Sequence, residues 1–231
     1  MKLRLMVALA FLTAFSCAAE PVRLFLRCGP KTHGPGEHDG PTFLTNWSRL
    51  LADRAAGATG SVVVVSMEGT RPLLVEVQAL VTPSNFGNAR CNTNGIEYNR
   101  LLMLLAVLTK RVGLSVGNHD VYANVVGGFT LEEPAIDLGV AAAIASSYRE
   151  KHIPADMVLI GEVGLSGELR AVSRLPLRVR EAAKLGFKRC IVPSAGKGAQ
   201  LRAEFENAGL PDDFKVIPSS SLAVALEIAL H

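Results

Sequence analysis

The stretch from Gly60 to Val81, GSVVVVSMEGTRPLLVEVQALV, constrains the fold of this chain more than any other segment. Val62 to Val65 and Leu73 to Val77 are largely apolar runs of strand length, rich in β-branched valine. Between them lies a Glu-Gly-Thr-Arg-Pro turn, in which Gly69 and Pro72 are the residues that interrupt regular structure. The sequence therefore predicts a β-hairpin at this place.

Composition sets limits on the class of protein. Apolar residues make up 49% of the chain, so it can bury a proper core. The net charge of +3 is too small to indicate nucleic-acid binding by itself, so any basic surface must be local. The cysteines are widely spaced and form no CxxC pair, which favours buried free thiols over a zinc site or a disulfide framework: Cys17, Cys28, Cys91 and Cys190.

Residues 1–19 have the arrangement of basic, apolar and small residues that is typical of a secretory signal peptide. Lys2 and Arg4 precede an apolar run from Leu5 to Phe15, and the small residues Ser16, Ala18 and Ala19 follow it. This pattern predicts export, with a buried core element as the alternative. The run is shorter than the about 20 residues that a membrane span needs, so we expect no stable membrane anchor.

Residues 20–53 predict one strand, a loop rich in Gly, Pro and His, and one amphipathic helix. The sequence CGPKTHGPGEHD resembles the opening strand and loop of ThuA-like (trehalose-utilisation) proteins, which have a glutamine-amidotransferase-like α/β fold and are often exported. Only the first βα unit of that family is present, roughly Val22 to Leu51. A lone βα unit cannot cover its own strand, so this quarter is not expected to be an independent domain.

The loop of this unit carries residue types that bind metals, namely His33, Glu37, His38 and Asp39. The intervening Gly-Pro-Gly forbids a shared helical face, so we expect no metal site. The ThuA-like resemblance implies instead a loop at a pocket whose remaining walls are absent.

The hairpin and three later segments carry a second resemblance. The segments are NGIEYNRLLMLLAVLTKRVGL, DVYANVVGGFTLEEPAIDLGVAAAIASSYR and GEVGLSGELRAVSRLPLRVREAAKLGFKRCIVP. Together with the hairpin they resemble the C-terminal Lon-protease-like domain of the RadA (Sms) family of bacterial DNA-repair proteins, from roughly Arg54 to His231. The resemblance implies an α/β sandwich of the ribosomal protein S5 domain 2-like class. It also implies a cytoplasmic, homo-oligomeric ring that contacts DNA recombination intermediates.

The expected organisation is therefore a signal-like segment at 1–19, a ThuA-like fragment at 20–53 and a RadA-type Lon-like domain at 54–231. The join near Arg54 is abrupt, which favours a truncated or artificially joined reading frame over a natural fusion of complete folding units. The chain has no four-cysteine zinc finger, no GxxxxGK[ST] phosphate loop and no Lys-Asn-Arg-Phe-Gly motif. We therefore expect no ATPase motor and no cofactor in this chain. The RadA-type resemblance implies a cytoplasmic protein, whereas a functional signal segment at 1–19 would imply export.

Hydrophobic periodicity predicts alternating strands and helices after the hairpin. Leu101, Leu104, Leu105 and Leu108 recur at i, i+3, i+4 and i+7, the spacing of one buried helix face. The predicted helices cover 96–112, 134–148, 175–185, 197–208 and 222–230. The predicted strands cover 61–82 as the hairpin, then 120–126, 157–160, 168–172, 189–192 and 214–216.

Lon-type peptidases use a serine at the start of a helix and a lysine one helix later as general base. The resemblance places Ala135 at the serine position and Arg178 at the lysine position. A methyl group cannot attack a carbonyl, and an arginine stays protonated because its pKa exceeds about 12. We therefore expect a non-peptidase domain, with a Lon-type Ser-Lys endopeptidase and a secreted ThuA-like sugar-pathway protein as the alternatives.

Other residues near these positions offer weaker candidates. Ser146 or Ser147 with Lys184 would make a relocated dyad, but serines near the end of an Ala-rich helix usually hydrogen-bond backbone or face solvent. The acidic residues Glu132, Glu133 and Asp137 are expected at a helix N-terminus because they complement the helix dipole.

Basic residues concentrate between Arg170 and Arg189, where Glu181 is the one acidic residue. Spacing places Arg180 and Lys184 on one helix row, extended by Lys188, and Arg174 and Arg178 on the neighbouring row. The alternatives are a solvated helix face and contact with DNA phosphates, which the ring resemblance favours. The DNA-contact candidates are Arg174, Arg178, Arg180, Lys184 and Lys188, together with Asn99 and Arg100, which match a signature of the RadA family.

Overall fold

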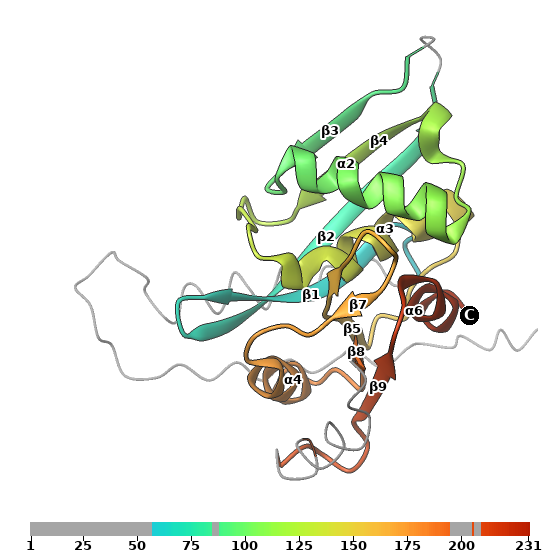
Figure 1. Ribbon diagram of the computed structural model, residues 1–231. Helices are drawn as coiled ribbons and strands as arrows, with labels where there is room; N and C mark the ends of the chain where they lie inside the picture. The colour runs from blue at the N-terminus through green and yellow to red at the C-terminus, as the bar shows by residue number, and fades with distance from the viewer. Residues whose placement is uncertain (1–56, 85–87, 195–204, 206–208) are drawn as a thin grey trace, which may run out of the picture.

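The computed structural model describes residues 57–84, 88–194, 205 and 209–231 of the chain (Figure 1). The predicted signal segment at 1–19 and the ThuA-like fragment at 20–53 lie outside these residues, as does nearly all of the predicted helix at 197–208. The proposed domain boundaries therefore stay predictions.

The core of the protein is a mixed seven-stranded sheet with the order β3-β4-β2-β1-β5-β8-β9. Its strands are β1 (Ser61–Glu68), β2 (Arg71–Pro83), β3 (Cys91–Asn94), β4 (His119–Val125), β5 (Met157–Leu159), β8 (Arg189–Pro193) and β9 (Lys215–Ser219). The β1–β2 and β2–β4 pairs are antiparallel, and the other four pairs are parallel. The prediction of an α/β fold is confirmed, and the Lon-like subtype stays a prediction.

The predicted hairpin is confirmed as β1 and β2. Glu68 pairs with Arg71, which leaves a two-residue loop, and Gly69 at its first position has a φ of 58°. Glycine adopts this left-handed φ without steric cost, which explains its place in the loop. Pro72 lies within β2, opposite Met67, and not in the turn itself.

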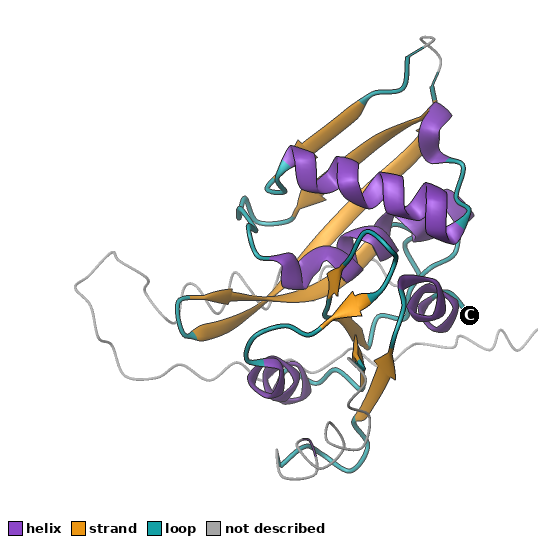
Figure 2. Ribbon diagram, viewed as in Figure 1, coloured by secondary structure: helices purple, strands orange, loops and turns teal. Residues whose placement is uncertain are grey.

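Helices cover both sides of the sheet (Figure 2). On one side α2 (Tyr98–Val107) continues into a π-helical turn (Leu108–Val112), and α3 (Asp137–Arg149) follows a 3-10 turn (Pro134–Ile136). The remaining described elements are a 3-10 turn (Val116–Asn118), a hairpin of β6 (Glu162–Val163) and β7 (Leu169–Arg170), α4 (Leu175–Lys184) and α6 (Leu222–Ala229). No helix among the described residues is long and apolar enough to cross a membrane.

Most of the predicted elements are confirmed within a few residues. The predicted strand at 214–216 lies slightly later as β9, and that at 168–172 shortens to β7. Strands β3 and β6 were not predicted, because their sequences Cys-Asn-Thr-Asn and Glu-Val carry little β-propensity signal at that length. Three residues of the predicted leucine stripe, Leu101, Leu104 and Leu108, are fully buried, and the fourth, Leu105, is partly buried against the same core.

Strand β1 separates two hydrophobic layers because its side chains alternate between the faces of the sheet. Val62 and Val64 pack with α2, α3 and α6, whereas Val63 and Val65 pack with α4 on the opposite face. The two helix layers are therefore kept apart by the sheet. This separation decides which of the candidate site residues can meet.

Helix α3 lies unusually close to β1. A Cβ atom added at Gly139 would come within 2.0 Å of Val64 Cγ1, so glycine is required there for the helix to approach. At its other end, Ser146 Oγ accepts a hydrogen bond of 2.8 Å from Gly60 N, and Ser147 Oγ accepts one of 2.9 Å from Val81 N. The helix is thus attached to the hairpin along its whole length.

Candidate functional site

Ala135 lies in the 3-10 turn that leads into α3, at the start of a helix where a Lon-type nucleophile is expected. Its side chain is buried, with 1% of the residue exposed. Its carbonyl oxygen accepts a hydrogen bond of 2.8 Å from Gly161 N, and Leu138 N donates one of 3.0 Å to Gly161 O. The helix start is therefore attached to the end of β5, and it presents a buried methyl group.

Arg178 is completely buried on α4, with 0% of the residue exposed. Its Nη1 donates to Val65 O at 2.7 Å and to Glu133 Oε2 at 2.9 Å, and its Nε donates to Ser173 O at 2.9 Å. Its Nη2 donates to the second carboxylate oxygen of Glu133, which makes the ion pair bidentate. Glu133 also accepts a hydrogen bond of 3.0 Å from Met67 N.

These contacts correct two sequence interpretations. Arg178 was placed on an exposed row of the basic helix, but its guanidinium points inward to the strand β1 backbone, so it is removed from the DNA-contact candidates. Glu133 was assigned to the dipole of the following helix, yet its carboxylate binds Arg178 and the backbone of β1. The position that the Lon-like resemblance assigns to the general base therefore holds a buried arginine, which links α4, β1 and the segment before α3.

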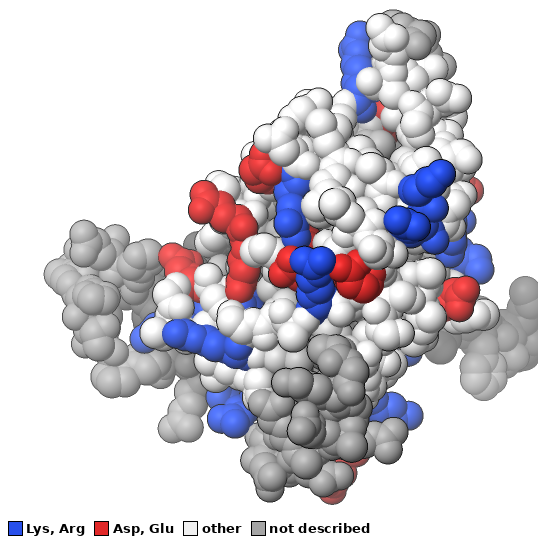
Figure 3. Space-filling view, in the orientation of Figure 1, with Lys and Arg blue, Asp and Glu red and all other residues white. Residues whose placement is uncertain are grey.

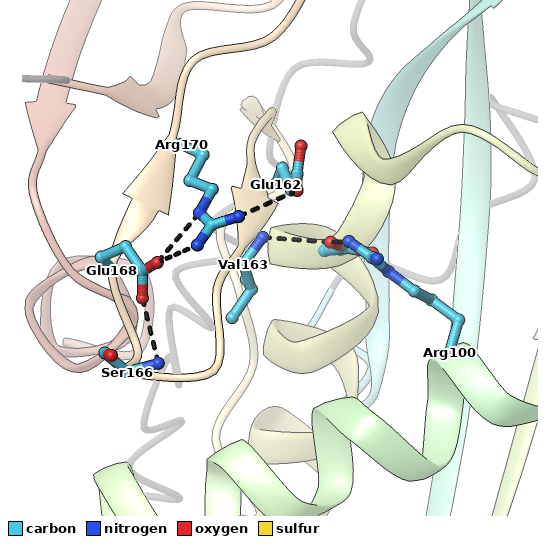
Figure 4. Close-up of polar contacts among 7 residues, drawn as sticks. Arg100, Glu162, Val163, Ser166, Glu168 and Arg170 are labelled. Atoms are coloured by element: carbon cyan, nitrogen blue, oxygen red, sulfur yellow. Dashed lines mark hydrogen bonds and ion pairs between the residues drawn. The ribbon is translucent and has the colours of Figure 1, made fainter.

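A second charged cluster lies on the opposite face of the sheet, between α2, α3 and the β6–β7 hairpin (Figure 4). Arg100 Nε donates to Asp137 Oδ1 at 2.8 Å, and its Nη2 donates to Asp137 Oδ2. Val163 N donates to Asp137 Oδ2 at 3.0 Å. Asp137 is 0% exposed, so this carboxylate links three elements from a buried position and has a specific partner beyond the helix dipole.

The pKa values within this cluster follow from burial and pairing. Burial raises the pKa of Asp137, and the bonds from Arg100 and Val163 N oppose that rise. Hydrogen bonding to Asp137 raises the pKa of Arg100, which keeps its guanidinium charged. Arg100 is therefore held in an internal pair, with 28% of its side chain exposed.

The β6–β7 hairpin carries the outer part of the cluster. Arg170 lies within 2.7 Å of Glu168 Oε1 and within 3.9 Å of Glu162 Oε1, and Glu168 also accepts from Ser166 N at 3.0 Å. Figure 4 shows these side chains arranged from the hairpin toward Arg100. Cations and carboxylates alternate here, so this face has no concentrated field of one sign.

The relocated dyad finds no support in the geometry. Ser146 accepts from Gly60 N and donates to Lys151 O, and Ser147 accepts from Val81 N. Lys184 lies on α4, beyond the sheet, where it pairs with Glu181 at 3.6 Å. Both serines thus hydrogen-bond backbone, which is one of the two outcomes that the sequence analysis expected.

The remaining basic candidates of the α4 region are exposed. Arg174 donates to Gly69 O at 3.3 Å, Lys188 pairs with Asp213, and Arg180 makes no ion pair with a described residue. Asn99 is exposed at the start of α2, where its backbone N–H donates to the N-capping carboxylate of Glu97 at 2.8 Å. The sheet separates α4 from α2, so Asn99 and Arg100 do not share a surface with the α4 group.

Figure 3 shows basic and acidic side chains interspersed over the face that carries α2. Within the described segments no group of three or more His, Cys, Asp or Glu residues is arranged to hold a metal ion. Of the cysteines, Cys190 is buried and free, burial raises its pKa, and Cys91 is partly exposed and free on β3.

Comparison with known proteins identifies relatives of this chain. It is 52% identical over 181 residues to the DNA repair protein RadA of Halalkalibacterium halodurans, which covers 78% of this chain and 38% of that relative. It is 49% identical over 194 residues to RadA of Bacillus subtilis, covering 83% of this chain and 40% of the relative. Residues 106–196 also match the family model described as subunit ChlI of Mg-chelatase.

These matches confirm homology to RadA over about four fifths of the chain. The chain spans about two fifths of the length of the curated relatives it matches. The Lon-like, ThuA-like and signal-peptide interpretations stay predictions.

The Arg178–Glu133 pair generates a stability prediction. Arg178→Ala leaves the Glu133 carboxylate and the Val65 carbonyl without their buried donor, so we expect a loss of about 3 kcal/mol in the free energy of unfolding. Arg180→Ala, on the same helix but exposed, should change it by less than about 0.5 kcal/mol. Urea denaturation of both variants measures the difference.

A double variant separates pairing from packing. Arg178→Met with Glu133→Gln removes both charges together, and the new amide can still accept from Met67 N. Its cost should be smaller than the sum of the two single variants, because no charge is left unpaired. Additive costs would contradict the assignment of the pair as a coupled unit.

Proposed function

We propose that this chain is a RadA-type, Lon-like domain without peptidase activity that serves DNA recombination and repair as an oligomerising, DNA-contacting platform. The observation that carries this proposal is its 52% identity over 181 residues to a protein named DNA repair protein RadA. The α/β sheet with helices on both faces is consistent with that homology.

In this proposal the domain catalyses no reaction by itself. The ATP-driven step of RadA-type proteins, branch migration of recombination intermediates, would belong to a motor with a phosphate loop, and this sequence contains no such motif. In this role the domain binds neighbouring subunits and contacts the phosphate backbone of DNA. A homo-oligomeric ring follows when one subunit surface binds a different surface of the next and the rotation closes.

The enzyme alternative, a Lon-type endopeptidase, requires a hydroxyl at Ala135 and a deprotonatable amine at Arg178. Neither chemistry is available there, and Arg178 is already bound to Glu133 and to the Val65 carbonyl. An amine in place of that guanidinium would give up the bidentate pair. These observations support a role without peptide hydrolysis.

We therefore predict no hydrolysis of casein or unfolded peptides by this chain. The assay follows release of soluble peptides with and without ATP, and a Lon-type peptidase provides the positive control. Turnover that a serine-directed inhibitor abolishes would overturn the non-peptidase assignment. The variant Ala135→Ser with Arg178→Lys should restore traces at most, because nothing indicates that oxyanion-stabilising donors are in place.

DNA contact, if it uses the α4 face, depends on the exposed residues Arg180, Lys184 and Lys188 and on Arg174 at the helix start. Phosphate contacts of this kind are independent of base sequence. They are also sensitive to salt, because each neutralised phosphate releases counterions and steepens the log-log slope by about 0.9 on duplex DNA.

The triple variant Arg180→Gln, Lys184→Gln and Lys188→Gln tests this surface. It should weaken binding to duplexes of any sequence. It should also flatten the slope of log binding constant against log salt concentration by the equivalent of roughly two to three phosphate contacts, which fluorescence anisotropy can measure. The matched control neutralises Lys110, Arg149 and Lys151, three exposed residues outside the α4 region. Equal binding by the triple variant and the parent at low salt would move the DNA site away from α4, with Asn99 and Arg100 as the next candidates.

A further inference from the structure

The second half of strand β1 has a described neighbouring strand on one side only. Toward β5, strand β1 pairs through Val63 and Val64, and no described strand pairs with it beyond Val64 on that side. The chain turns away after β5, because the N–H and C=O of Gly161 both bond to the start of α3. The loop end of the hairpin therefore extends past β5 (Figure 1). We call this side of β1, from Val65 to Glu68, the distal edge.

The backbone groups that face the distal edge follow from the pairing of β1 with β2. Met67 lies opposite Pro72, which has no N–H to donate, and Met67 N donates to Glu133 and not to β2. The N–H and C=O of Met67 therefore point away from β2. Because strand groups alternate in direction, those of Val65 point the same way. At an open sheet edge, such groups pair with the strand of another molecule.

Two charged side chains take the place of a neighbouring strand at the distal edge. Arg178 Nη1 donates to Val65 O at 2.7 Å, and Glu133 Oε2 accepts from Met67 N at 3.0 Å. The two side chains also bind each other, so the donor and the acceptor are held side by side along β1. Arg178 is completely buried, so a competing strand cannot reach Val65 O while the pair is in place.

Arg174 extends this arrangement to the hairpin loop. It precedes Arg178 by four residues, is exposed, and its Nη1 donates to Gly69 O at 3.3 Å. Backbone groups of residues 65, 67 and 69 therefore all receive side-chain partners, from α4 or from the segment before α3. The buried pair covers the strand itself, and the exposed arginine covers its end.

The opposite end of the sheet is protected in a different way. Strand β9 contains the exposed residues Lys215 and Pro218, and lysine and proline both disfavour pairing at a sheet edge. The distal edge has the sequence Val-Ser-Met-Glu, which contains neither residue type. Its protection therefore depends on the side chains that bind it from outside the strand.

We propose that the Arg178–Glu133 pair occupies the position of an edge strand and prevents the distal edge from pairing with the same edge of a second copy of the chain. A second copy fits because the edge is self-complementary. In antiparallel order the Val65 C=O of each copy meets the Met67 N–H of the other. The pair thus closes an interaction surface, which is a role beyond its contribution to stability.

The variant Arg178→Met with Glu133→Leu opens the distal edge and leaves no charge unpaired, which favours retention of the fold. Circular dichroism verifies that retention. We expect this double variant to form β-rich assemblies at tens of micromolar about tenfold faster than the parent chain. Thioflavin T fluorescence reports the new intermolecular strands, and light scattering reports their growth with time, whereas a closed native oligomer keeps a fixed mass. A folded double variant that does not assemble would contradict the proposal.

Adding Met67→Pro to the double variant tests the edge itself. Proline removes the N–H that a second strand needs, and the ladder to β2 is kept because Met67 N points away from β2. The triple variant should return to the low assembly rate of the parent. Assembly as fast as that of the double variant would overturn pairing at the distal edge.

A matched control separates exposure of the edge from loss of stability. Leu104→Ala removes a fully buried side chain under α2 and leaves the Arg178–Glu133 pair in place. Urea denaturation gives the stability of each variant, and the assembly rates are compared at temperatures that give equal unfolded fractions. There Leu104→Ala should assemble about tenfold more slowly than the double variant. Equal rates would show that unfolding alone causes assembly, which would refute a protective role of the pair.

Discussion

The structure depends on the burial of strand β1 on both faces, from Ser61 to Ser66. Val62, Val63, Val64 and Val65 are each at most 1% exposed, because alternate side chains enter the helix layers on the two faces of the sheet. A strand buried on both faces must be continuously apolar, which is why the four consecutive valines precede the hairpin turn. Helix α3 then approaches so closely that Gly139 has no room for a side chain.

Polar groups in this core are placed where they connect layers. Glu133 receives hydrogen bonds from Arg178 of α4 and from Met67 of β1, so one carboxylate joins elements on both sides of the strand. Asp137 does the same for α2 and the β6–β7 hairpin through Arg100 and Val163. Because removing one partner of a buried pair leaves an uncompensated charge, such pairs fix the relative positions of the elements they join.

This use of charge bears on function. Ala135 and Arg178, the positions that the Lon-like resemblance assigns to a peptidase dyad, are a buried methyl group and a buried cation. Among the described residues, the protein exposes the basic α4 region and the mixed charges near α2.

Sequence alone predicted the α/β class, the hairpin and nearly all of the described helices, because valine runs and leucine spacing record burial directly. It left two outcomes open for Ser146 and Ser147, backbone hydrogen bonding or exposure to solvent, and the structure shows the first. It misplaced Arg178. Charge and helical spacing indicate which residues share one side of a helix, but they do not tell whether that side faces solvent or a buried carboxylate such as Glu133. The pairing of Glu133 with Arg178 joins residues 45 positions apart, and such a contact is determined by the fold and not by local sequence.

The most direct test of the platform account is the molar mass of the full chain, measured by light scattering at tens of micromolar with and without duplex DNA. The account predicts one closed homo-oligomer, with a mass that is an integral multiple of the 24.5 kDa subunit and that persists when DNA is added. A strictly monomeric chain under both conditions would contradict the RadA-type platform.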